Sequence, residues 1–181
     1  SQTLLDLYTI QKEFGKLEGH TIAFVGDLKY GRTVHSLVKA LTHFGAKLYF
    51  VAPETLQMPK YILEDLDSLG IEYTLLNDYR EIMGEIDVFY MTRIQRERFP
   101  DDEEYEKVKD VYILNKEDVV GKAKEEMIIL HPLPRVNEIA VNLDDTKHAL
   151  YFKQAANGVP VRQALLSLSL GYKAKLQEGD K

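Results

Sequence analysis

Apolar and polar positions follow two distinct periods along this chain. Short apolar runs bounded by glycine or polar residues predict strands at 21–26, 47–52, 71–75, 86–91 and 127–130, of which the first and last should be buried. Apolar positions three and four residues apart predict helices at 2–14, 34–44, 59–69, 78–83 and 116–123. Two further helices are predicted at 148–156 and 160–170, interrupted at Asn157 and Gly158. Strands and helices therefore alternate over most of the chain.

This alternation predicts an α/β fold. We expect a doubly wound, Rossmann-like parallel sheet of about five strands with helices on both faces, as one domain over residues 1–181. Right-handed crossovers place the carboxyl ends of parallel strands at one edge of the sheet. The loops at 27–33, 92–97 and 131–136 should meet at that edge, where open α/β sheets bind ligands.

A stiff turn follows the last predicted strand. Its sequence, HPLPRV at 131–136, has proline at alternate positions, which stops both a strand ladder and a helix. Each proline also favours extended backbone in the residue before it. The carbonyl groups of Leu133 and Pro134 could then face a ligand, although a plain rigid loop fits this spacing equally well. We expect His131 to brace the turn rather than to act as a base.

The connection at 92–110 differs from the others in length and charge. It contains Arg93, Arg96 and Arg98, followed by five acidic residues between positions 101 and 106. Long connections of this kind are uncommon in compact domains and often serve as active-site lids. A lid and a solvated acidic loop are both consistent with the pattern.

Composition narrows the classes of function. The 181 residues include 23 Lys and Arg against 29 Asp and Glu, a formal net charge of −6, which argues against nucleic acid as a partner. There is no cysteine for a disulfide or a thiolate metal site, and the five histidines are scattered over different predicted elements. We therefore expect no metal and no cofactor. No membrane span or signal peptide is visible, which predicts a cytoplasmic protein without a membrane partner.

Two arginines are the candidate ligand-binding residues. Arg32 lies near the start of a predicted helix, where its guanidinium and the helix N-terminus can both face an anion. Arg93 follows the fourth predicted strand, with Gln95 two residues later. Arginine binds a carboxylate as a planar fork, so the pair suits a ligand with two carboxylates. Alternatively, Arg93 pairs with Glu97 or lies on the surface.

Other enzyme classes lack their sequence signatures. The glycines at 26 and 31 do not form a G-x-G-x-x-G run, which weakens the hypothesis of a nucleotide-binding oxidoreductase. Neither a G-x-S-x-G elbow nor an H-E-x-x-H motif is present.

Four motifs in order resemble the catalytic chain of the aspartate carbamoyltransferase family. They are QTLLDL at 2–7, GDLKYGRTVHSL at 26–37, MTRIQRER at 91–98 and HPLPRV at 131–136. The related ornithine enzymes carry a cysteine in their equivalent of the proline turn, whereas this chain has Pro132, which favours the aspartate branch. The resemblance covers only the C-terminal, aspartate-binding half of that family. The family's Ser-Thr-Arg-Thr loop for carbamoyl phosphate is not present.

The resemblance implies a role for each matching residue. Arg32 would bind the α-carboxylate of L-aspartate, and Arg93, helped by Gln95, the β-carboxylate. The carbonyls of Leu133 and Pro134 would accept hydrogen bonds from the carbamoyl amide, and Gln2 would contact carbamoyl phosphate. The segment 92–110 would be a mobile lid, with lid and closure contacts from Lys29, Tyr30, Glu97, Glu104 and Tyr105.

The resemblance also implies the wider context. It implies a transferase of pyrimidine biosynthesis, catalytic homotrimers in the full-length family, and regulatory subunits as further candidate partners. The helices at 1–14 and 160–171 would bridge to a carbamoyl phosphate domain, leaving their apolar faces partly uncovered here. We expect this chain to bind L-aspartate but to be inactive alone. The alternative is a non-enzymatic binding or scaffold module that kept the fold.

Overall fold

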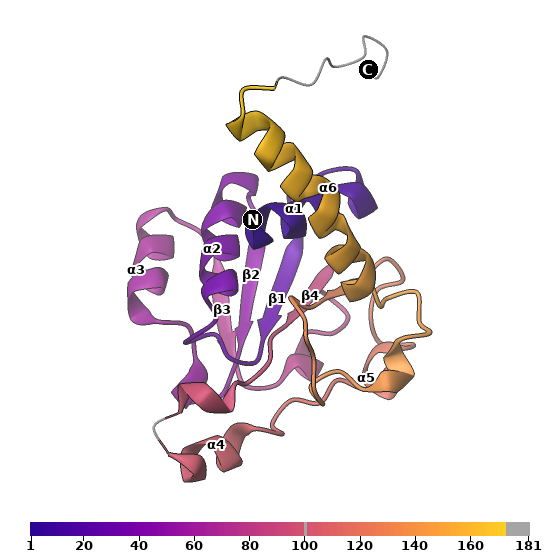
Figure 1. The fold of residues 1–181 in the computed structure, drawn as a ribbon. Helices are drawn as coiled ribbons and strands as arrows, with labels where there is room; N and C mark the ends of the chain where they lie inside the picture. Colours follow the sequence, from indigo (N-terminus) through magenta and orange to yellow (C-terminus); the bar gives the residue numbers. More distant parts are fainter. Residues whose placement is uncertain (100, 173–181) are drawn as a thin grey trace.

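The computed structural model describes residues 1–99 and 101–172, and its centre is a five-stranded sheet in the order β3-β2-β1-β4-β5 (Figure 1). The strands are β1 (Thr21–Val25), β2 (Lys47–Val51), β3 (Tyr73–Leu76), β4 (Val88–Met91) and β5 (Ile128–Leu130). All four neighbouring pairs are parallel. The predicted α/β class and five-stranded parallel sheet are confirmed.

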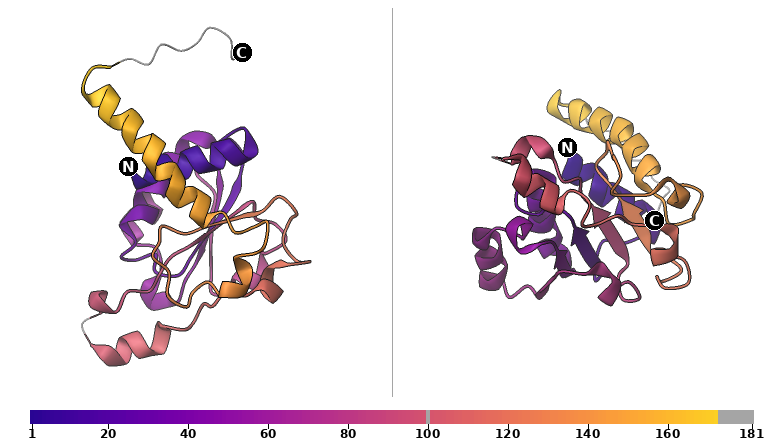
Figure 2. Two further views of the ribbon diagram at one scale, coloured as in Figure 1. Left: turned by 45° about the vertical axis from the view of Figure 1, so that its right-hand side comes forward. Right: turned by 90° about the horizontal axis from the view of Figure 1, so that it is seen from below.

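Helices cover both faces of this sheet. The α-helices are α1 (Gln2–Phe14), α2 (Arg32–Leu41), α3 (Lys60–Ser68), α4 (Asp102–Val108), α5 (Lys116–Val119) and α6 (Tyr151–Ser169). Five short 3-10 turns join them, at Thr42–Phe44, Glu54–Leu56, Tyr79–Glu81, Arg96–Arg98 and Val141–Leu143. The view from below in Figure 2 shows the sheet between these layers.

The core is divided between the two faces because side chains alternate along a strand. Phe24 of β1 and Tyr90 of β4 pack with α1, α2 and α3 on one face. Ala23, Val25 and Phe89 point to the opposite face, where the packing residues come from shorter elements. Burial on both faces explains the continuous apolar runs of these strands.

The segment 92–110, which the sequence indicated as a loop or lid, is partly helical. The segment contains a 3-10 turn and the helix α4, which begins where the side chain of Asp101 accepts a hydrogen bond from the backbone N–H of Glu104 at 2.8 Å. The acidic run supplies a helix cap and three acidic residues in the first turn, which the helix dipole favours.

The predicted break in the last helix was wrong, since α6 runs without interruption through Asn157, Gly158 and Pro160. Asn157 is buried and donates from Nδ2 to Oγ1 of Thr9 on α1 at 2.9 Å. A side chain at Gly158 would meet Leu5 of α1 and Arg162. Close packing on α1 therefore favours the small and polar residues that local signals assign to a break.

The second half of α6 extends beyond the body of the domain (Figures 1 and 2). Its leucines are largely exposed, with Leu168 at 64% and Leu170 at 73%, and α1 exposes Leu4 and Tyr8. The predicted apolar faces are thus partly uncovered, while their bridging role stays a prediction. No helix in the described ranges has the length and apolar character needed to cross a membrane. At 177–181 the sequence predicts a frayed tail, and these positions lie outside the described residues.

Candidate anion-binding site

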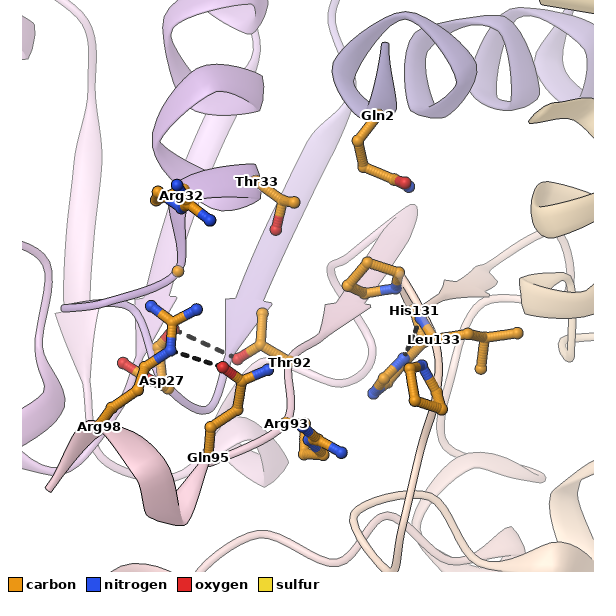
Figure 3. Close-up of a pocket in the computed structure, with 13 residues that line it drawn as sticks. Gln2, Asp27, Arg32, Thr33, Thr92, Arg93, Gln95, Arg98, His131 and Leu133 are labelled. Carbon is orange, nitrogen blue, oxygen red and sulfur yellow. Dashed lines mark hydrogen bonds between the residues drawn. The ribbon is translucent and has the colours of Figure 1, made fainter. Parts of the chain in front are cut away.

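A cavity of about 230 Å³ lies at the carboxyl ends of β1, β4 and β5 (Figure 3). The three loops predicted to meet at this edge all line it. The lining residues are Gln2, Asp27, Gly31, Arg32, Thr33, Thr92, Arg93, Gln95, Arg98, His131, Pro132, Leu133 and Pro134. The strand order reverses at β1: β2 and β3 follow on one side of it, and β4 and β5 on the other. The cavity therefore sits at the topological switch point of the sheet.

Arg32 reaches the cavity from the first residue of α2. The helix is preceded by Gly31, which offers no side chain to cap it. The N–H of Arg32 donates to the carbonyl of Tyr30 at 2.9 Å, while among the described residues the N–H groups of Thr33 and Val34 remain available to a ligand. The loop before it is fixed from below: His35 bonds through Nε2 to the carbonyl of Leu28 at 2.7 Å. His35, on α2, therefore supports this loop.

Asp27 anchors the same loop. It is 2% exposed, and its Oδ1 accepts a hydrogen bond from the N–H of Tyr30 at 2.9 Å. Burial raises the pKa of Asp27, against the opposing effects of the Tyr30 hydrogen bond and the nearby Arg98 charge. Gly26 beside it has φ 114°, and a Cβ there would lie 2.5 Å from the carbonyl oxygen of Thr92. Only glycine allows β1 and β4 to end this close together.

The second wall comes from the segment after β4. Arg93 and Gln95 line the cavity, as predicted, and Arg98 joins them (Figure 3). Arg98 donates from Nε to Oε1 of Gln95 and from Nη1 to the carbonyl of Tyr30, both at 2.5 Å. It thereby holds Gln95 and ties this segment to the first loop. The contact between Arg93 and Glu97 is long, at 3.5 Å, so the guanidinium of Arg93 is only loosely engaged.

The third wall is the proline turn, with His131 at its base. His131 is 2% exposed; its Nδ1 accepts from the N–H of Leu133 at 2.8 Å, and its Nε2 lies 2.7 Å from Oε1 of Glu138. Because Nδ1 accepts, Nε2 carries the hydrogen donated to Glu138. Leu133 has a left-handed φ of 47°, which this contact supports. The prediction that His131 braces the turn is confirmed.

The buried Glu138 and the partly buried Asp144 stabilise the turn from behind. Burial opposes ionisation of Glu138, but hydrogen bonds, first among them the one from His131, outweigh it and lower the pKa of the carboxyl. Arg135 donates to both oxygens of Asp144, at 2.5 and 2.6 Å, and holds the pKa of Asp144 below its usual value. Tyr151 donates to the same carboxylate. The turn is thus held by hydrogen bonds that are mostly shielded from water.

The cavity is positively charged although the chain is negative. Of the described residues that line it, Arg32, Arg93 and Arg98 are cationic and Asp27 is the one acid, against a net charge of −6 for the whole chain. Arginines from two different loops and a helix N-terminus suit a small ligand with two separated carboxylates. The opposite end, with Gln2 and the proline turn, offers an amide and carbonyl oxygens to a polar group.

The predicted lid and closure residues do not line this cavity. The ring of Tyr30 packs edge-on against Phe99, which packs against Tyr105, so the aromatic contacts connect the segment to the first loop. Lys29 lies over the ring of Tyr30. Within residues 1–99 and 101–172, no hydrogen bond or ion pair joins Glu104 to Lys29 or to Tyr30. A closure contact from Glu104 stays a prediction.

Known proteins match this arrangement closely. The sequence profile described as aspartate/ornithine carbamoyltransferase, Asp/Orn binding domain, matches residues 18–169. The chain belongs to the aspartate/ornithine carbamoyltransferase family. The aspartate branch predicted from the motifs is confirmed by the relatives that follow.

Among curated relatives, the aspartate carbamoyltransferase catalytic subunit of Brachyspira hyodysenteriae is 56% identical over 169 residues, covering 93% of this chain and 47% of the relative. The solved catalytic subunit of M. jannaschii aspartate transcarbamoylase is 55% identical with a TM-score of 0.85, covering 91% of this chain and 55% of that one. A Trypanosoma cruzi aspartate transcarbamoylase, solved with carbamoyl phosphate and aspartate, is 39% identical with a TM-score of 0.85 and the same coverage. This chain therefore spans about half the length of the family members it matches.

The sequence did not identify every residue of the cavity. Asp27, Thr33, Thr92 and Arg98 line the cavity and were not predicted. Thr33 is adjacent to Arg32, and Thr92 is the first residue after β4, so their positions at strand and helix ends were a usable signal. Arg98 offered none, because its contact with Tyr30 joins residues 68 positions apart.

Proposed function

We propose that this chain supplies the L-aspartate side of an aspartate carbamoyltransferase active site. The observation that carries the proposal is the convergence of Arg32 and Arg93 on one cavity from two different strand ends. In this arrangement Arg32 and the N-terminus of α2 bind the α-carboxylate. Arg93 binds the β-carboxylate, and Gln95, oriented by Arg98, supports it. The family of the chain and the positive charge of the cavity support the same ligand.

The other end of the cavity faces carbamoyl phosphate. Gln2 and the carbonyls of Leu133 and Pro134 contact the carbamoyl group, and the carbonyls also position the attacking amine. The deprotonated amine of aspartate attacks the carbamoyl carbon, and the bond from that carbon to the phosphate oxygen breaks. Phosphate leaves with the electron pair and takes up the proton that the amine nitrogen loses. Catalysis then rests on positioning and charge stabilisation, with no covalent intermediate on the protein.

The complete reaction needs groups beyond this chain's sequence, since relatives are about twice its length. We expect L-aspartate and carbamoyl phosphate added to the 181 residues alone to yield no carbamoyl aspartate above background. Association as a catalytic trimer, regulatory subunits and a cytoplasmic location belong to the same proposal. A non-enzymatic module would have no use for both arginines, yet both are present at the cavity.

An NMR titration tests the ligand. Succinate and L-aspartate should shift amide signals around Arg32 and Arg93 with a Kd of roughly millimolar or weaker. Arg93→Gln should weaken binding by about tenfold or more, because one charge-assisted contact contributes roughly 1.5–3 kcal/mol. Arg96→Gln is the matched control, since Arg96 pairs with Asp102 on the surface and does not line the cavity.

Three outcomes would contradict the proposal. They are shifts confined to other parts of the domain, equal loss of binding in the Arg93 and Arg96 variants, and L-ornithine binding as well as L-aspartate does. The last follows because the ammonium of ornithine is repelled where Arg93 attracts a carboxylate.

A further inference from the structure

Asp6 is a buried carboxylate beneath the cavity that the proposed reaction does not use. It is 0% exposed and lies on α1, where three side chains donate to it. Gln2 and Gln154 donate to Oδ1 at 2.8 and 2.7 Å, and the hydroxyl of Tyr90 donates to Oδ2 at 2.9 Å. One carboxylate thus joins α1, α6 and β4.

Two of these donors lead directly to the cavity. Gln2 lines it (Figure 3). Gln154 uses its other end, Oε1, to accept the backbone N–H of His131 at 2.8 Å, at the base of the proline turn. Gln2 is therefore one hydrogen bond from Asp6, and the turn is two, through Gln154. These are the two elements on the side of the cavity opposite the arginines Arg32 and Arg93.

Packing of α1 on α6 does not require a charge at this position. The same helices are joined by the neutral pair of Asn157 and Thr9, also buried and also 148 positions apart. Burial raises the pKa of Asp6 to about 6, against the hydrogen bonds from Gln154, Tyr90 and Gln2. The fold therefore keeps a carboxylate where ionisation is unfavourable, although a neutral contact would join the helices equally well.

We propose that Asp6 is a positioning residue, which holds Gln2 and the base of the proline turn in one arrangement and releases both together when it is protonated. The inference rests on the proposed function only for the identity of the ligand at that end of the cavity. It deepens that function by making one wall of the site responsive to pH.

The hydrogen-bond chemistry gives the reason for joint release. All three partners donate to the ionised carboxylate, and a proton on Oδ2 forces one to change role. Tyr90 can rotate its hydroxyl and accept, whereas the amide groups of Gln2 and Gln154 cannot. Both amides are left on a neutral carbonyl oxygen, which binds donors about half as strongly as a carboxylate does.

The surroundings of Asp6 contain few other titratable groups. Tyr90 faces it from β4, and the α-amino group of Ser1 acts on it from the start of α1. From α6 only the neutral Gln154 reaches it, and beyond Gln154 lies the pair of His131 and Glu138. The imidazole of His131 is thus the other ionisable group along this path, and the test has to separate the effect of Asp6 from it.

Ligand-free NMR over about pH 4.5–8 makes this separation. In the wild-type chain, the carboxyl carbon of Asp6, the side-chain amides of Gln2 and Gln154 and the N–H of His131 should titrate with one shared midpoint. Asp6→Asn, which keeps the shape of the side chain, should abolish the transition in the three reporters. Asn157→Ala, which breaks the neighbouring neutral contact, should leave midpoint and amplitude unchanged.

A second variant keeps the test decisive if Asp6→Asn does not fold. Tyr90→Phe removes one donor to the carboxylate, so the shared midpoint should move upward. Separate midpoints, a transition that survives Asp6→Asn, or a midpoint unmoved by Tyr90→Phe would each overturn the inference. Failure of succinate to bind would instead contradict the proposed function and leave this titration intact.

Discussion

The proline turn and the segment 92–110 form opposite walls of the same cavity, and they are stabilised in opposite ways. The turn is held by contacts of His131 with Glu138 and Gln154, all buried. The segment holds itself together largely by ion pairs of exposed residues, such as Arg96 with Asp102 and Lys109 with Glu106. Its links to the rest of the domain include Arg98, the contact of Phe99 with Tyr30 and the buried side chain of Val108.

This difference separates a fixed wall from one able to move. Buried polar groups cannot exchange their partners for water, so breaking one contact leaves an unsatisfied group. Exposed ion pairs exchange readily with water and contribute little to stability. A site that must admit a charged ligand and then exclude water can use a segment of the second kind, here 92–110, as its lid.

The largest expected effect is on the fixed wall. Glu138→Ala should lower the free energy of unfolding by about 3–5 kcal/mol, because it strips the partner from the buried Nε2–H of His131 and the N–H of Val136. Urea unfolding measures this. Glu138→Gln, which retains an acceptor, should lose less, and a loss below about 1 kcal/mol for the alanine variant would contradict the buried anchor.

The next effect concerns the buried carboxyl groups of Asp6 and Glu138, whose pKa values are shifted in opposite directions. Because the folded pKa of Asp6 is raised to about 6, its favourable contribution is complete below the unfolded value and is lost as the pH rises through 6. The stability of Asp6→Asn relative to wild type should therefore increase between pH 4 and pH 7, by up to about 3 kcal/mol. The lowered pKa of Glu138 gives the opposite slope, with stability lost as the pH falls.

Urea unfolding of the wild type, Asp6→Asn and Glu138→Gln at several pH values checks these slopes. Equal slopes for Asp6→Asn and the wild type would show that the carboxyl of Asp6 titrates as it does in the unfolded chain.

A smaller effect is expected at the link between the walls. Arg98→Ala should weaken succinate binding by about five- to tenfold, because Gln95 loses the donor that orients it and the segment loses its contact with Tyr30. Hydrogen exchange of the amides in α4 should quicken as well. Unchanged affinity with unchanged exchange would mean that Arg98 does not couple the segment to the site.

The smallest effect is expected on the surface of the movable wall. Asp102→Ala breaks the bidentate contact with Arg96, whose side chain is 65% exposed, and should produce no measurable change in melting temperature. Differential scanning calorimetry measures it. A clear drop would show that the exposed pairs fix this segment, and the contrast between the two walls would disappear.

The sequence alone located the strands, the three loops and the principal arginines. Buried parallel strands leave continuous apolar runs, and the loops that follow them must meet at one edge, so Arg32, Arg93 and the proline turn could be placed together. His131 was correctly predicted to brace its turn, because prolines at 132 and 134 leave that backbone few partners.

Only the tertiary structure decided how α6 continues and what supports the site. Local sequence preference predicts a helix break at Asn157, Gly158 and Pro160, but packing against α1 outweighs that preference. The partners of Asp6 include Gln154, 148 positions away, and nothing near either residue announces the contact. Local propensity is set by adjacent residues, whereas burial and hydrogen bonding depend on which distant segments the fold brings together.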